Sequence, residues 1–171
     1  MADYANAYVK FKIKPQFKKA FETILKREKR NQSKYFEWFD YFSFITTNGE
    51  IKTSNPYGEN DYIYLEGMGL NINLFDDYNE QNAVNKIEND IVSIKMYKKW
   101  APIDTMEKII RNNLSEIAEE VYFCEMIAYD NDDEQYYLVS YDVKIEKDED
   151  YPEYTSATLI EKNRKSMNYE D

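Results

Sequence analysis

Four carboxylates stand together in the C-terminal half of the chain: Asp130, Asp132, Asp133 and Glu134. Acidic side chains at alternate positions are typical of the start of a calcium-binding loop, which supplies oxygen ligands from its first, third and fifth residues. Here Gln135 stands where such a loop needs glycine, and Tyr141 stands where it needs a bidentate glutamate. Because Asn and Asp tolerate turn dihedrals, we interpret the cluster as a turn between two strands.

A second acidic pair, Asp76-Asp77, follows a predicted strand, where α/β enzymes often place carboxylates that hold Mg²⁺. No spacing singles out the further acids of a phosphoryl-transfer or glycosidase site, since 33 acidic residues make some pair inevitable. A carboxylate-metal-dependent hydrolase is therefore our third hypothesis.

Other catalytic chemistry is excluded by composition. The chain has no histidine and one cysteine, which rules out Ser-His-Asp and Cys-His nucleophiles, zinc sites built on His or thiolates, and iron–sulfur clusters. Its four glycines have neither Walker nor dinucleotide-binding spacing: Gly49, Gly58, Gly67 and Gly69. We expect a protein that is not an enzyme, with no metal site and no cofactor.

The first 36 residues are basic, with ten Lys/Arg against three Asp/Glu, a net charge of +7. This segment offers a nucleic-acid face, our second hypothesis: Lys10, Lys12, Lys18, Lys19, Lys26, Lys29 and Arg30. Tyr35, Phe36 and Trp38 would stack on bases. The net charge of the whole chain, −11, opposes long-range attraction to a polyanion, so we rank nucleic-acid binding below protein binding.

The remaining 135 residues are acidic, with 12 Lys/Arg and 30 Asp/Glu, a net charge of −18. From Glu125 onward these acids alternate with tyrosines, which are favoured at interface cores, while carboxylates steer a basic surface. The predicted partner-binding residues are Asp130, Asp132, Asp133, Glu134, Tyr136, Asp148, Glu149, Asp150 and Tyr151. The competing interpretation is an acidic surface kept for solubility, with the tyrosines in the core.

Our first functional hypothesis is accordingly a non-catalytic binding protein that docks on a basic protein. Its concrete form is an inhibitor of a nuclease or host-defence protein, encoded by a phage or mobile element. The abundance of Asn, Lys, Ile and Tyr is typical of an AT-rich genome, such as that of a low-GC bacterium. The basic and acidic faces would also let copies of the chain associate as a homo-oligomer.

In the N-terminal half, residues 9–14 alternate Lys with apolar side chains, which predicts a half-buried strand closed by Pro15. An amphipathic helix is expected from Phe17 to about Arg30, whereas the aromatic stretch 35–39 is ambiguous between helix and strand. The Asn48-Gly49 pair predicts a hairpin between segments 43–47 and 50–53. A loop over 54–60 precedes further predicted strands at 61–66, 70–75 and 91–97.

In the C-terminal half, the spacing of Asp104 and Glu107 predicts a capping box for a helix with an apolar stripe that reaches Val121. A hairpin over 122–129 and 135–145, an acidic loop over 147–153 and a strand over 154–161 should follow. The chain therefore reads as one α+β domain over 1–171, mostly antiparallel, with two main helices. A repeat of two βαββ halves, 1–80 and 90–161, is a further expectation.

The sequence also predicts a compartment. Cys124 lies in a mostly apolar run and has no second cysteine to pair with, which suits a reducing cytoplasm. No apolar run approaches the roughly 18 residues that span a bilayer, and the first residues lack the apolar region of a signal peptide. We expect a cytoplasmic protein without membrane contact.

Overall fold

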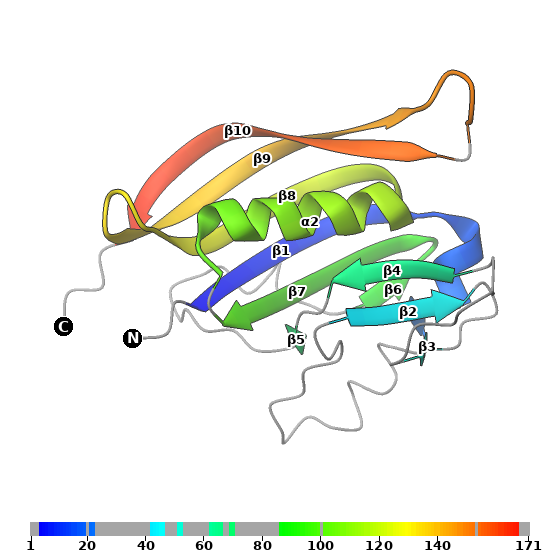
Figure 1. The fold of residues 1–171 in the computed structure, drawn as a ribbon, viewed down its shortest axis with the longest axis horizontal. Coiled ribbons are helices and arrows are strands. Elements are labelled where there is room, and N and C mark those ends of the chain that lie inside the picture. The colour runs from blue at the N-terminus through cyan, green and yellow to red at the C-terminus, as the bar shows by residue number, and fades with distance from the viewer. Residues whose placement is uncertain are drawn as a thin grey trace.

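The computed structural model describes residues 4–19, 21–22, 42–46, 51–52, 62–66, 69–70, 86–99, 101–152 and 154–167. Most of them belong to one seven-stranded antiparallel sheet with the order β10-β9-β8-β1-β7-β5, in which β6 also pairs with β7 (Figure 1). Its strands are β1 (Tyr4–Ile13), β5 (Gly69–Leu70), β6 (Lys86–Glu88), β7 (Ile91–Lys99), β8 (Ala118–Asp130), β9 (Gln135–Lys147) and β10 (Thr155–Met167). The α+β, mostly antiparallel class is confirmed.

A separate three-stranded sheet has the order β3-β2-β4, with β2 (Phe42–Thr46), β3 (Ile51–Lys52) and β4 (Tyr62–Glu66). The predicted pairing of β2 with β3 is confirmed, whereas its Asn48-Gly49 turn lies outside the described residues. So do the aromatic stretch 35–39, the loop 54–60 and most of the helix predicted from Phe17 to Arg30. The two-half repeat is not confirmed, because β2–β4 form their own sheet while β8–β10 extend the large one.

The central strand β1 shows how the alternating pattern positions the core. Val9, Phe11 and Ile13 are buried on the side of the helix α2 (Ile103–Ile117), whereas Lys10 is exposed, as the period of two predicts. Toward its N-terminus β1 is buried on both faces, since Tyr8 packs with Ile127 in a second cluster on the opposite side. The strand therefore begins earlier than its alternation indicates.

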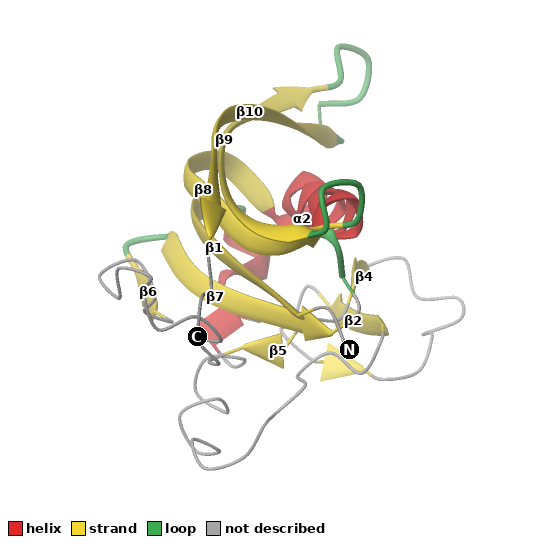
Figure 2. Cartoon of the chain, turned by 90° about the vertical axis from the view of Figure 1, so that its left-hand side faces the viewer, coloured by secondary structure: helices red, strands yellow, loops and turns green. Residues whose placement is uncertain are grey.

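The helix α2 lies in the hollow of the curved sheet, and its apolar stripe fills the core with Met106, Ile109, Ile110, Leu114 and Ile117 (Figure 2). The predicted capping box is wrong. Pro102 is the N-cap, its φ of −63° and ψ of 172° set the entry, and its carbonyl accepts the N–H of Met106. Asp104 lies in the first turn and makes no side-chain cap.

The expected extension of this helix to Val121 is also wrong. The helix ends at Ile117, and Ala118 already has extended backbone angles and begins β8. Pairing with β1 decides this boundary, because Ile13 lies opposite Ala118 and Phe11 opposite Val121. Val121 therefore packs against the core from a strand, so the apolar stripe continues across a change of secondary structure.

The strands β8, β9 and β10 form an antiparallel meander that curls over α2 (Figure 2). The hairpin and the acidic loop are confirmed, although β10 continues to Met167, six residues past the predicted end, with a bulge between Glu161 and Asn163. Because of the curl, the edge of β10 meets the end of α2: the N–H of Ala157 donates to Ser115 Oγ (2.9 Å), and Thr155 Oγ1 donates to the Ser115 carbonyl (2.6 Å). The helix thus covers this part of the sheet edge.

Replacing Ser115 with Ala should lower the free energy of unfolding by about 1–3 kcal/mol, because the buried N–H of Ala157 would lose its acceptor. Ser156→Ala, at an exposed neighbouring position, is the matched control and should change stability by less than about 0.5 kcal/mol. Urea titration followed by circular dichroism measures both. Equal midpoints for the two variants would show that Ser115 does not secure this edge.

Candidate acidic binding site

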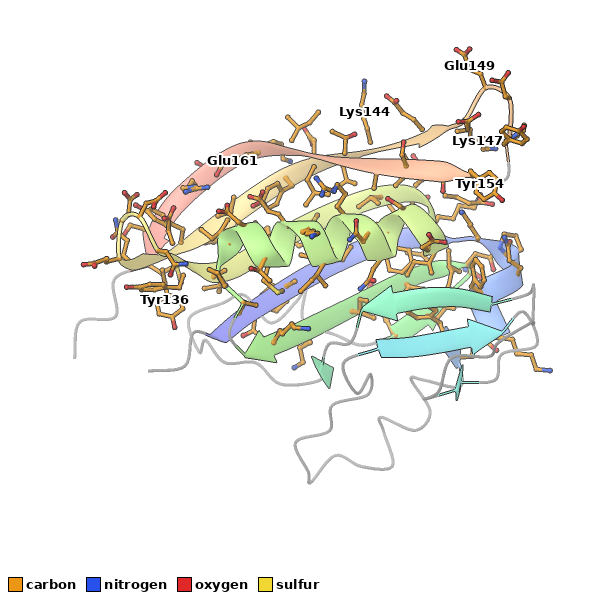
Figure 3. The ribbon with its side chains drawn as sticks, viewed as in Figure 1. Tyr136, Lys144, Lys147, Glu149, Tyr154 and Glu161 are labelled. Carbon is orange, nitrogen blue, oxygen red and sulfur yellow. The ribbon has the colours of Figure 1, made fainter. Side chains whose placement is uncertain are left out.

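The predicted partner-binding residues fall into two groups at opposite ends of β9. Asp130, Asp132, Asp133, Glu134 and Tyr136 lie at the β8–β9 turn, and Asp148, Glu149, Asp150 and Tyr151 lie at the β9–β10 turn. β9 has 13 residues, so the two turns are about 40 Å apart along the strand. Figure 3 shows Tyr136 at one end of the molecule and Glu149 at the other. The structure therefore brings the residues within each group together, but it holds the two groups far apart.

The β8–β9 turn is built around the Asp130 carboxylate. Its Oδ1 accepts the N–H of Asp132 (2.9 Å) and of Asp133 (3.3 Å), and Glu134 has a positive φ of 55°. This geometry confirms a turn stabilised by an Asp side chain. Within the described ranges, no three acidic or Cys side chains are grouped so that they could hold a metal ion.

A guanidinium is bound beside this turn. Arg164 of β10 donates from Nη1 to Asp130 Oδ2 (2.9 Å) and from Nε to Glu161 Oε1 (2.6 Å), and it lies 5.2 Å from the centre of the Tyr137 ring. Tyr137 in turn donates its hydroxyl to Asp133 Oδ2 (2.6 Å), which raises the pKa of the tyrosine. Two carboxylates and a tyrosine ring thus hold one arginine.

These contacts predict a pH dependence. The backbone N–H of Asp133, with that of Asp132 and the Arg164 charge, holds the pKa of Asp130 below its ordinary 3.8. Because the folded-state pKa is depressed, the stabilisation is complete above pH 3.8 and is lost as pH falls through the folded-state pKa. Asp130→Asn should therefore flatten the loss of stability between about pH 5 and about pH 2, measured by thermal unfolding. Asp132→Asn is the control, and an unchanged slope in Asp130→Asn would contradict the assignment.

The β9–β10 turn is closed by the Asp148 carboxylate and by two backbone hydrogen bonds. Asp148 Oδ1 accepts the N–H of Asp150 (2.9 Å) and of Tyr151 (3.0 Å), while Asp148 N–H donates to the Tyr154 carbonyl and Tyr154 N–H to the Tyr151 carbonyl. Tyr151 and Tyr154 are 59% and 66% exposed, and their rings meet edge to face with centroids 6.2 Å apart. No ion pair in the described part of the chain engages Glu149 or Asp150. This turn presents two aromatic rings and uncompensated carboxylates to solvent.

A shallow hollow of about 190 Å³ lies between the start of α2 and the β8–β9 turn. Pro102, Ile103 and Tyr129 give it apolar walls, and Asp104 and Asp132 give it negative charge. It adds a concave, acidic feature to the β8–β9 end.

The tyrosines divide between core and surface. Tyr141 is only 4% exposed, and its hydroxyl donates to Glu107 Oε1 (2.7 Å); burial and this bond raise its pKa. Tyr136 is half-buried against the Tyr8–Ile127 cluster, with its ring 5.2 Å from that of Tyr129. Among the tyrosines that follow Glu125, Tyr141 therefore packs inside, as the competing interpretation expects, whereas Tyr151 and Tyr154 are strongly exposed.

Two described lysines of the basic N-terminal segment form ion pairs with the acidic remainder. Lys18 Nζ lies 2.8 Å from Asp90 Oδ1, and Lys12 Nζ lies 3.5 Å from Glu119 Oε2. Burial lowers the pKa of Lys14, against the raising effect of Glu116 and Glu119. Lys10 and Lys19 are both exposed. The other residues of the proposed nucleic-acid face lie outside the described residues: Lys26, Lys29, Arg30, Tyr35, Phe36 and Trp38.

Other candidate chemistry is limited. Cys124 is 2% exposed, and burial raises the pKa of its thiol to about 12, so it is not a reactive thiolate. Asp76-Asp77 lies outside the described residues. No helix in the ranges given above has the length and apolar character needed to cross a bilayer.

Sequence reasoning missed Arg164 and Tyr154 as site residues. Arg164 is 34 residues from Asp130, so the pairing of β9 with both β8 and β10 is what brings them together. Tyr154 was predicted to begin a strand, whereas it closes the turn just before β10. Its position three residues after Tyr151, across a proline, was the available signal.

Comparisons with protein-family models, curated proteins and solved structures found no match to this chain.

Proposed function

We propose that this protein is a non-catalytic binding domain whose acidic C-terminal surface engages a basic protein. One observation carries the proposal: in the described residues, no ion pair compensates Asp132, Glu134, Glu149 or Asp150, whereas Lys12 and Lys18 are paired with acids of the same chain. The net charge of each turn is negative, also where Lys147 ends β9 beside Asp148, Glu149 and Asp150. Such a field attracts a basic surface and repels a polyanion.

The concrete form of the proposal is inhibition of a nuclease or another protein that handles nucleic acids, by a factor of phage or mobile-element origin. Such a target carries a basic cleft for phosphates, and surface carboxylates are the protein groups that match it in charge. We further propose a cytoplasmic setting, which the buried free thiol of Cys124 supports.

The proposal is tested with purified DNases and RNases acting on fluorescent DNA and RNA, with the same probes run in gel shifts without nuclease. We expect dose-dependent slowing of at least one nuclease at about 150 mM salt, and no shift of the probes themselves. A probe shift that is lost in a Lys10, Lys18 and Lys26 triple alanine variant would replace the proposal with nucleic-acid binding. Unchanged cleavage by every nuclease would overturn the inhibitor form.

A further inference from the structure

The strands β9 and β10 extend past the body of the large sheet. Among the described residues, β9 pairs with β8 from Gln135 to Ser140, and beyond that its partner is β10 alone. Residues 142–152 and 154–160, the β9–β10 arm, therefore form a two-stranded hairpin outside the sheet. In Figure 1 the turn of this arm stands away from β8.

Two features coincide where the arm leaves the sheet. Ser140 is the last residue of β9 that pairs with β8, and its Oγ donates to Glu125 Oε1 (3.0 Å). On β10 the bulge between Glu161 and Asn163 lies at the same level, because Asn163 pairs with Ser140. A bulge interrupts the ladder and bends its strand. Both strands change at this level, which is the arrangement of a hinge.

The arm is held on α2 by few contacts. Among its described residues, Ala157 alone is buried. Three half-buried apolar side chains pack against the core: Val143, Ile145 and Leu159. Ser115 of α2 accepts the Ala157 N–H through its Oγ and the Thr155 hydroxyl through its carbonyl. Segments with few buried apolar contacts are those that open at the lowest cost.

The base of the hairpin is anchored separately from the arm. On β9, the buried Tyr141 lies beside the hinge, and its hydroxyl donates to Glu107 Oε1 of α2 (2.7 Å). On β10, Arg164 lies past the bulge and is bound to Asp130 of the β8–β9 turn (2.9 Å). Both strands are thus fixed to the body at the hinge, whereas Ser115 holds the arm beyond it.

We propose that the β9–β10 arm is a hinged strap, which closes on the C-terminal end of α2 through Ser115 and swings off it as one unit. Movement at the hinge breaks the two hydrogen bonds to Ser115. It leaves the β9–β10 ladder formed, because this ladder continues into the part of the hairpin that β8 holds. The swing requires no partner, so it stands independently of the proposed function.

The Ala157 amide reports the swing. Because its N–H points to Ser115, the N–H groups of Ser156 and Thr158 on either side point to β9 and stay bonded when the arm moves. Amide hydrogen exchange of the full chain, read by NMR, measures all three. After correction for intrinsic rates, Ala157 should exchange at least about tenfold faster than Ser156 and Thr158.

A core variant separates the swing from unfolding of the whole molecule. Ile94 is buried on β7, and β7 lies on the far side of β1 from the arm. Ile94→Val should speed the exchange of the Val9 and Phe11 amides in β1 about two- to tenfold. It should leave Ala157 unchanged, since the core stays packed when the arm swings.

A second variant tests the hinge. Lys162 is the extra residue of the bulge, so its deletion makes the ladder regular and should slow the exchange of Ala157. Lys162→Ala is the control, because it removes the ion pair with Asp142 but keeps the bulge, and it should leave Ala157 unchanged. An equal Ala157 rate in the deletion and in wild type would overturn the assignment of the hinge to the bulge.

Two patterns of exchange would overturn the hinged strap. One rate shared by the three arm amides and the β1 amides, and raised in Ile94→Val, would mean that the arm opens only with the whole molecule. One rate shared by Ala157, Ser156 and Thr158, but unchanged in Ile94→Val, would mean that the arm unfolds and does not swing.

Discussion

Reversing Asp132, Glu134, Glu149 and Asp150 to Lys should slow association with an inhibited nuclease by at least about tenfold at low salt. Each reversal adds two charges, so the net charge changes from −11 to −3. No ion pair among the described residues uses these four carboxylates, whereas Asp130 and Asp148 hold the turns together. Stopped-flow association rates at several ionic strengths measure the effect, which should shrink as salt rises.

Pairs of reversals separate the two turns. Asp132→Lys/Glu134→Lys and Glu149→Lys/Asp150→Lys each change the net charge by four, as does the control pair Glu116→Lys/Glu120→Lys, at exposed positions on α2 and β8. We expect a reduction from each turn and little reduction from the control. Equal slowing by all three pairs would mean that only the total charge matters.

Phe11→Ala should reduce the free energy of unfolding by about 3–5 kcal/mol, a large share of the stability of a typical domain. Phe11 is fully buried in the C-terminal part of β1, opposite Val92 on β7 and Val121 on β8, with its ring 6.1 Å from that of Phe21. Its removal leaves a cavity under the helix α2 that these strands cannot close.

The matched control is Lys10→Ala, one residue earlier on the exposed side of the same strand, which should change stability by less than about 0.5 kcal/mol. Guanidinium titration monitored by tyrosine and tryptophan fluorescence measures both variants. A loss below about 1 kcal/mol in Phe11→Ala would place the core elsewhere than between β1 and α2.

Periodicity in the sequence was sufficient where one face of an element meets water. The alternation of Lys10 and Lys12 with Phe11 predicted β1, and the acidic cluster at Asp130 predicted the β8–β9 turn. Periodicity failed where strand pairing, and not the local sequence pattern, decides the secondary structure and burial. Ala5 to Tyr8 are buried on both faces and show no alternation. The strand β10 continues through charged residues because it lies at the sheet edge.

The candidate site was predicted in composition but not in arrangement. The acidic residues were found because Asp and Glu cluster in turns, yet nothing local indicates that β9 separates the two clusters by its whole length. Nor does the sequence show that Tyr141 turns into the core toward Glu107 while Tyr154 remains exposed. These distinctions follow from strand register, which is set by contacts between residues distant in the chain.

The central claim, that the acidic turns bind a basic protein, is tested most directly by amide hydrogen exchange of the full chain, alone and bound to an inhibited nuclease. We predict new protection at the exposed turn residues 131–134, at 148–151 and at Tyr154, and no change around Lys10 and Lys12 of β1. Protection confined to residues 9–19, with both acidic turns exchanging as in the free protein, would contradict the account.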